Sequence, residues 1–203
     1  MPYLTYQPTG LTGPNRPRPA LIFLHGAAEV GTDVERVRRV GPPAQVEGGR
    51  RLPFVVIAPQ SAATRWDLRA LDLLLDHVLA DGRVDPARVA LTGFSMGGAA
   101  TWAWAAERPD RFAAIAPMCG VGDPSRADRL RDVQVWAFHG ELDRVVPPSR
   151  THAMVDHLRS KGANARLTIY PDLGHDCWTR AYAEASLYEW LLRQRKGSAA
   201  ASE

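Results

Sequence analysis

A serine flanked by glycines stands where an apolar strand pattern changes into a helical one. Residues 90–106 read ALTGFSMGGAATWAWAA and contain the pattern G-x-S-x-G around Ser95. A strand that turns directly into a helix strains the corner residue and pushes its side chain outward. The glycines allow close packing, and the helix N-terminus presents free N–H groups to negative charge. The pattern predicts that Ser95 is a nucleophile; the alternative is a glycine-rich turn without catalytic function.

A serine hydroxyl needs a base that takes its proton and an acid that orients the base. His175 lies in YPDLGHDCW, after the last expected strand, where it could reach Ser95. The preceding unit ends in HGELDRVVP, which supplies Glu141 and Asp143 as candidate acids. We favour Asp143 because the apolar VVP after it could anchor the loop. The order Ser95, Asp143, His175 is the order of a triad on a parallel sheet of this kind.

The other five histidines are assigned roles outside the chemistry. His25 and His139 each end an apolar strand pattern and precede glycine, so we interpret them as structural residues. The other three lie within helical patterns, where a solvated or partly packed histidine is the usual case: His77, His152 and His157. His175 therefore remains as the predicted base.

An oxyanion hole needs N–H donors placed where negative charge develops. The N–H of Met96, directly after the nucleophile, is one predicted donor, and the N–H of Ala27 in HGAAEVG is the other. Trp66 and Trp178 are candidates for the substrate pocket. Packing beside loops is the alternative role for both tryptophans.

Short apolar segments alternate with amphipathic ones along the chain. The expected strands are residues 3–7, 20–25, 54–58, 89–92, 113–118, 135–139 and 165–170. The expected helices are residues 33–40, 68–80, 96–107, 148–161 and 177–193. We expect Asp85-Pro86 to break the chain before a strand resumes at Val89. Continuous apolar runs such as LIFL and FVVIA indicate strands covered on both faces. The pattern predicts an α/β fold, with a mostly parallel sheet between helical layers and ligands at the carboxyl ends of its strands.

Chain length, net charge and the lengths of the apolar runs limit the classes of protein to which this sequence could belong. Residues 1–196 suit a single domain and 197–203 a disordered tail. The arginine clusters are short and carry no interleaved aromatic residues, so we expect no nucleic-acid partner despite a net charge of +3. No apolar run approaches the roughly 20 residues of a membrane span. The first residues show no signal-peptide pattern, so a cytoplasmic location is expected.

The two cysteines, Cys119 and Cys177, are too few for a metal cluster and are expected to be reduced and packed as small apolar groups. A triad hydrolase needs neither a metal nor an organic cofactor. We therefore expect no cofactor for this chain.

These segments resemble the serine esterases of the α/β-hydrolase superfamily. The chain is most similar to the lidless carboxylesterase/phospholipase-type branch and to the dienelactone-hydrolase-like and predicted-peptidase esterases. The matching segments are LIFLHGAAEVG, VVIAPQ followed by Trp66, LTGFSMGGA, WAFHGELDRVVP and YPDLGHDCW. The resemblance implies an α/β-hydrolase fold, with Ser95 as nucleophile, Asp143 as acid, His175 as base and the oxyanion donors given above.

Two positions depart from the resemblance. Ala28 stands where many relatives have a second glycine. Dienelactone hydrolases use cysteine at the elbow, so Ser95 argues against that particular reaction.

The connection between the fifth and sixth expected strands is short. Residues 119–134 are too few for a multi-helix cap, which favours an open site.

We therefore expect a hydrolase of small or soluble carboxylic esters, with a small-molecule ester as its partner and no membrane partner. Two alternatives stay open: a peptidase of short peptides, and a catalytically silent scaffold that acts as a binding module. The sequence also leaves a homodimer open.

Overall fold

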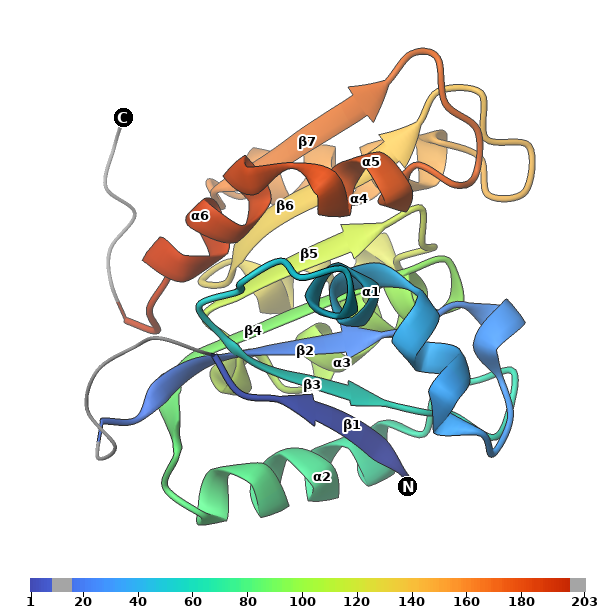
Figure 1. The fold of residues 1–203 in the computed structure, drawn as a ribbon. Coiled ribbons are helices and arrows are strands. Elements are labelled where there is room, and N and C mark those ends of the chain that lie inside the picture. Colours follow the sequence, from blue (N-terminus) through green and yellow to red (C-terminus); the bar gives the residue numbers. More distant parts are fainter. Residues whose placement is uncertain (9–15, 198–203) are drawn as a thin grey trace.

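The computed structural model describes residues 1–8 and 16–197 and contains one seven-stranded sheet (Figure 1). The strands lie in the order β1-β3-β2-β4-β5-β6-β7. Only β1 is antiparallel to its neighbour, and the remaining pairs are parallel. The strands are β1 (Tyr3–Tyr6), β2 (Arg18–Leu24), β3 (Val55–Pro59), β4 (Val84–Phe94), β5 (Ala114–Met118), β6 (Gln134–Gly140) and β7 (Ala165–Tyr170). All seven predicted strands are confirmed; the last has the predicted ends, and each of the other six is shifted at one end or both.

Helices cover both faces of the sheet, as the continuous apolar strands predict. The α-helices are α1 (Gly41–Glu47), α2 (Leu68–Ala80), α3 (Met96–Glu107), α4 (Ser149–Ser160), α5 (Trp178–Ala183) and α6 (Ala185–Arg193). One core layer packs α2, α3 and α4 against the sheet, and a second packs α1, α5 and α6. In Figure 1 the second group lies in front of the sheet. Alternate residues of β2 enter the two layers: Ile22 and Leu24 enter one, Leu21 and Phe23 the other. The architecture is that of an α/β-hydrolase fold.

The expected break at Asp85-Pro86 is wrong, because β4 begins at Val84 and runs through both residues. The pairing of β2 with β4 accommodates these residues in a β-bulge. Arg18 pairs with Val84, but the next paired residue of β2, Ala20, pairs with Val89. The Asp85 carboxylate accepts the N–H of Ala87 at 2.9 Å, which closes a local turn within the bulge.

Two helical predictions need correction. The helix expected over residues 177–193 is two helices, because Glu184 is extended and its carboxylate accepts the Tyr170 hydroxyl at 2.7 Å. The helix expected over residues 33–40 is a 3-10 helix, Val34–Arg39. The sequence analysis did not predict α1, which begins GPP. Prolines in the first helical turn remove N–H groups that have no helical partner there, so they fit this position.

The connection between β5 and β6 is short. Between Met118 and Gln134 it forms a 3-10 helix, Pro124–Leu130, and no α-helix is assigned to it. The predicted tail lies almost wholly outside the described part, which ends at Gly197, so its disorder stays a prediction. Among the described residues, no helix has the length and apolar character needed to cross a membrane.

Candidate active site

Ser95 stands at the joint between β4 and α3 in a strained conformation. Its φ of 54° and ψ of −117° lie in a region that residues with a side chain rarely adopt. Its N–H donates to the carbonyl of Met118 on β5 at 2.9 Å, while its carbonyl accepts the N–H of Ala99 at 2.9 Å. Two backbone bonds therefore hold the corner. The sharp turn predicted around Ser95 is present.

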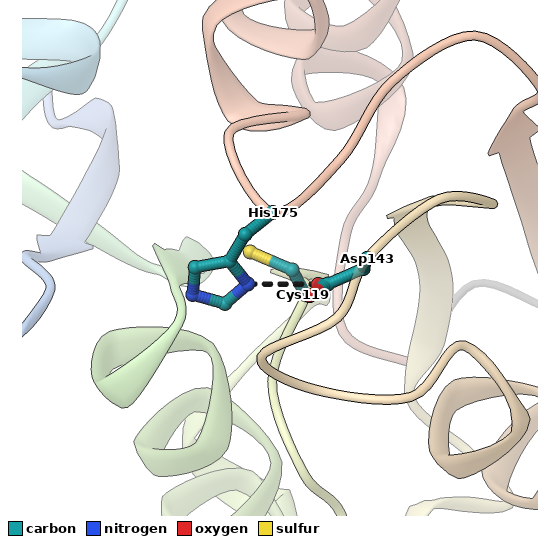
Figure 2. A group of neighbouring side chains, drawn as sticks. All are labelled: Cys119, Asp143 and His175. Carbon is teal, nitrogen blue, oxygen red and sulfur yellow. Dashed lines mark hydrogen bonds and ion pairs between the residues drawn. The ribbon is translucent and has the colours of Figure 1, made fainter.

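Three side chains from three strand ends meet at this corner. The Nε2 atom of His175, after β7, lies 2.9 Å from Oγ of Ser95. Its Nδ1 atom lies 2.7 Å from Oδ2 of Asp143, after β6 (Figure 2). The structure thus brings the three predicted residues together in the expected connectivity. Glu141, the alternative acid, is exposed to solvent.

The Asp143 side chain is fully buried and fully hydrogen-bonded. Its Oδ1 atom accepts the backbone N–H groups of Val145 and Val146 at 2.8 and 2.9 Å. Burial alone would raise the pKa of Asp143, but the hydrogen bonds from His175 and these two N–H groups hold it below its usual value. A charged carboxylate requires a proton on Nδ1 of His175. The unprotonated Nε2 can then accept the hydroxyl proton of Ser95.

The predicted oxyanion donors lie at the same edge of the sheet. Met96 is the first residue of α3, so its N–H has no acceptor within the helix. Ala27 begins a short 3-10 helix, Ala27–Glu29, separated from the end of β2 by two residues. The end of β2 touches the start of α3: a Cβ added to Gly97 would lie 2.7 Å from the carbonyl oxygen of His25. Ala27 is exposed and Met96 is half-buried, so the edge they share is open to solvent.

Residues 56–189 match the model of the dienelactone hydrolase family. The chain belongs to this family. It is 34% identical over 113 residues to "Putative carboxymethylenebutenolidase" of Escherichia coli O157:H7; the match covers 50% of this chain and 42% of that protein. It is 26% identical over 198 residues to a bifunctional acetylxylan esterase/xylanase of Neocallimastix patriciarum, covering 91% of this chain and 27% of that protein. The matches thus span less than half of either relative.

Among solved structures, a thermostable esterase superposes with a TM-score of 0.84 at 32% sequence identity. The match covers 95% of this chain and 59% of that structure. The family match and this superposition agree with the α/β-hydrolase resemblance of the sequence. Within the dienelactone hydrolase family, this chain has serine at the elbow.

Cys119 lies beside the Asp143–His175 pair (Figure 2). One ligand atom from each of these three residues lies within 4.8 Å of the others, a spacing that a metal ion could bridge. However, burial, followed by the adjacent Cys177 thiol, strongly raises the pKa of Cys119. The raised pKa favours the protonated thiol, and the hydrogen bond between Nδ1 of His175 and Oδ2 of Asp143 already uses a ligand atom of each of the other two residues. We interpret Cys119 as packing beneath the acid–base pair. Both cysteines are free and buried, as predicted.

The two candidate pocket tryptophans have different surroundings. Trp66 is buried, and its ring lies 4.7 Å from the ring of His25. It lines a cavity of about 340 Å³ together with Met96 and three alanines of α3: Ala99, Ala100 and Ala103. Trp178 instead stacks on Phe94, with 4.2 Å between the ring centroids. It also forms a T-shaped contact with the ring of His175, with 5.5 Å between the ring centroids.

The sequence analysis missed the role of His139. It lies near the end of a strand, as predicted, and is buried, but its Nε2 atom lies 3.0 Å from Oδ2 of Asp143. The sequence carries one signal for this contact: His139 precedes the acid by four residues in HGELD, across the turn that follows β6.

Proposed function

We propose that this protein hydrolyses carboxylic esters through an acyl-enzyme on Ser95. One observation carries the proposal: the unbroken hydrogen-bonded series from Ser95 through His175 to Asp143, with the nucleophile in a strained turn. Family membership supports a hydrolytic reaction. The elbow residue supports an oxygen nucleophile, unlike the cysteine of dienelactone hydrolases.

In the first half-reaction, Oγ of Ser95 bonds to the ester carbonyl carbon while Nε2 of His175 takes the hydroxyl proton. The carbonyl oxygen becomes an oxyanion, which the N–H groups of Met96 and Ala27 stabilise. Each such donor contributes about a hundred- to thousandfold in rate. When the tetrahedral intermediate collapses, the C–O bond to the alcohol breaks and the alcohol leaves with the proton from Nε2.

In the second half-reaction, water attacks the acyl carbon and Nε2 takes one of its protons. Collapse of this intermediate breaks the bond to Oγ, which recovers its proton from the imidazolium, and the carboxylic acid leaves. Asp143 keeps Nδ1 protonated throughout and stabilises the positive ring. Its lowered pKa favours this role, because the carboxylate remains charged.

The cavity beside Trp66 is the proposed site for the apolar group of the ester. Met96 connects it to the nucleophile, because this residue lines the cavity and directly follows Ser95. The volume of about 340 Å³ lies at the small end of ligand pockets. Small or medium-sized esters therefore fit better than long-chain lipids. Trp178, which contacts His175, is proposed as a wall that holds the base.

The test is hydrolysis of 4-nitrophenyl acetate, butyrate, octanoate and palmitate by wild type and by Ser95→Ala. We expect activity on the shorter esters and a loss of at least about 1,000-fold in kcat/KM in the variant. Ser186→Ala is the matched control, because Ser186 is exposed on α6. Labelling of wild type, but not of Ser95→Ala, by a fluorophosphonate would show the nucleophile directly.

Each alternative has its own outcome. Faster hydrolysis of an aminoacyl anilide than of the matched 4-nitrophenyl ester would favour the peptidase. Equal inertness of wild type and Ser95→Ala toward all substrates and toward the fluorophosphonate would refute the proposal and favour a binding scaffold.

A further inference from the structure

A second histidine, His139, contacts the carboxylate that binds the proposed base. It is completely buried at the end of β6. Its Nε2 atom lies 3.0 Å from Oδ2 of Asp143, and Nδ1 of His175 lies 2.7 Å from the same oxygen. One carboxylate oxygen is therefore shared by two imidazole rings.

The partners of His139 assign its tautomer. Its Nε2 atom faces two acceptors, Oδ2 of Asp143 at 3.0 Å and the carbonyl of Val146 at 2.9 Å. Only an N–H can satisfy both, so the hydrogen lies on Nε2. Burial lowers the pKa of His139, which favours the neutral ring, and a neutral ring with hydrogen on Nε2 has an acceptor at Nδ1.

Thr151 supplies the donor that this acceptor needs. Its hydroxyl, on the first turn of α4, lies 2.7 Å from Nδ1 of His139 and is itself buried. A threonine hydroxyl can donate to an unprotonated nitrogen, whereas a carbonyl or a methyl group in the same place could not. The reversed tautomer of His139 would direct a lone pair at two oxygen atoms.

We propose that His139 and Thr151 are positioning residues for the acid. The Thr151 hydroxyl donates to Nδ1 of His139 and so supports the tautomer that the acceptors at Nε2 require, and the His139 N–H holds Oδ2 of Asp143 where it meets Nδ1 of His175. The inference rests on the proposed function, since it concerns the geometry of the same acid–base pair. It extends the hydrogen-bonded series to five side chains, from Thr151 on α4 to Ser95 at the start of α3.

The sharpest test compares two substitutions of one residue. Thr151→Val removes the hydroxyl but keeps the branched shape, and Thr151→Ser keeps the hydroxyl. We expect Thr151→Val to lower kcat about three- to tenfold while KM stays within about twofold, because an acid set at a wrong angle slows proton transfer rather than binding. Thr151→Ser should restore kcat to nearly the wild-type value.

His139→Phe removes the N–H itself while keeping a ring of similar shape. We expect kcat to fall about 10- to 100-fold, because Asp143 can shift once this N–H is lost and a misplacement of about 1 Å costs about 100-fold in rate. Rates are expressed per folded enzyme, with the folded fraction taken from near-ultraviolet circular dichroism. Wild-type kcat in folded Thr151→Val and folded His139→Phe would overturn the proposal and leave these residues a packing role.

A spectroscopic measurement separates this inference from the proposed function. The Nδ1–H of His175 should give a downfield proton NMR resonance that His175→Ala removes. We expect Thr151→Val and His139→Phe to shift or broaden it and Thr151→Ser to leave it in place, whether or not esters are turned over. An inert wild type with the expected NMR shifts would refute only the esterase proposal. An active wild type whose resonance is the same in all three variants would refute only the positioning role.

Discussion

Gly97, two residues after Ser95, is where the backbones of α3 and β2 touch. A Cβ on Gly97 would lie 2.0 Å from the carbonyl oxygen of Leu24 and 2.5 Å from its carbon. Both atoms belong to the backbone of β2, which is paired on both sides. No side chain can move aside to relieve the overlap. We therefore expect Gly97→Ala to displace the start of α3.

The distance by which α3 must move determines the expected losses of stability and of hydrolysis rate. Ordinary van der Waals contact begins at 3.4 Å, so a Cβ at 2.0 Å requires a shift of 3.4 − 2.0, or about 1.4 Å, if the helix moves along the line of contact. Overpacking of this kind costs about 3 kcal/mol of unfolding free energy. A misplacement of about 1 Å costs about 100-fold in rate, because Met96 and Ser95 move with the helix.

Urea denaturation and 4-nitrophenyl acetate hydrolysis measure the two effects in one preparation. Gly48→Ala is the control: Gly48 has a φ of −73°, and its added Cβ would lie 3.3 Å from the Ala44 carbonyl oxygen. We expect that variant to stay within about 1 kcal/mol of wild type in stability. If Gly97→Ala unfolds within about 0.5 kcal/mol of wild type and keeps its rate, the contact between β2 and α3 does not position the nucleophile.

Two further predictions concern protonation and specificity. Burial is the main cause that lowers the pKa of His25 and His139 below 6.5. Near that pH the folded state therefore binds fewer protons than the unfolded state. The free energy of unfolding should be greatest above pH 6.5 and fall as the pH drops below 6.5. Urea unfolding at about pH 7.5 and about pH 5.5 checks the sign, and equal stability at both would contradict it. Ala103→Phe should fill the cavity beside Trp66 and lower kcat/KM about tenfold for 4-nitrophenyl octanoate but little for acetate. An equal loss on both esters would place the apolar group elsewhere.

The sequence patterns predicted the fold and the meeting of Ser95, Asp143 and His175 because each depends on local features. Continuous apolar strands indicate a sheet covered on both faces, and residues that follow parallel strands must gather at one edge. Asp143, which we preferred to Glu141, is the carboxylate that contacts His175, but the apolar VVP side chains expected to anchor its loop are not buried. The loop is anchored by the backbone N–H groups of Val145 and Val146, and the Val145 side chain is 69% exposed.

The features that sequence reasoning missed depend on contacts between distant elements. In the sequence, Thr151 is one polar residue within a helical pattern. Its contact with His139 exists only because α4 packs against the sheet and brings the Thr151 hydroxyl to that ring. Glu184 looks helical in sequence, but its carboxylate accepts the Tyr170 hydroxyl of β7, and the chain is extended there between α5 and α6. Neither contact leaves a periodic signal, because each partner lies on another element.

Two parts of α3 contribute differently to the proposed reaction: one positions the reacting groups and the other lines the cavity proposed for the ester. Its first residues provide the turn at Ser95 and the N–H of Met96, where a shift of the backbone would alter the geometry of the reaction. Its next turns present Ala99, Ala100 and Ala103 to the cavity, where a larger side chain would change the space without touching the acid–base pair. The three residues of the proposed triad follow β4, β6 and β7, whereas one face of α3 lines the cavity together with residues of other segments such as Trp66 and Val121. The proposed preference among esters can therefore change while the geometry of the triad stays fixed. Substitutions along this face should therefore alter the ratio of rates between esters more than the rate on acetate.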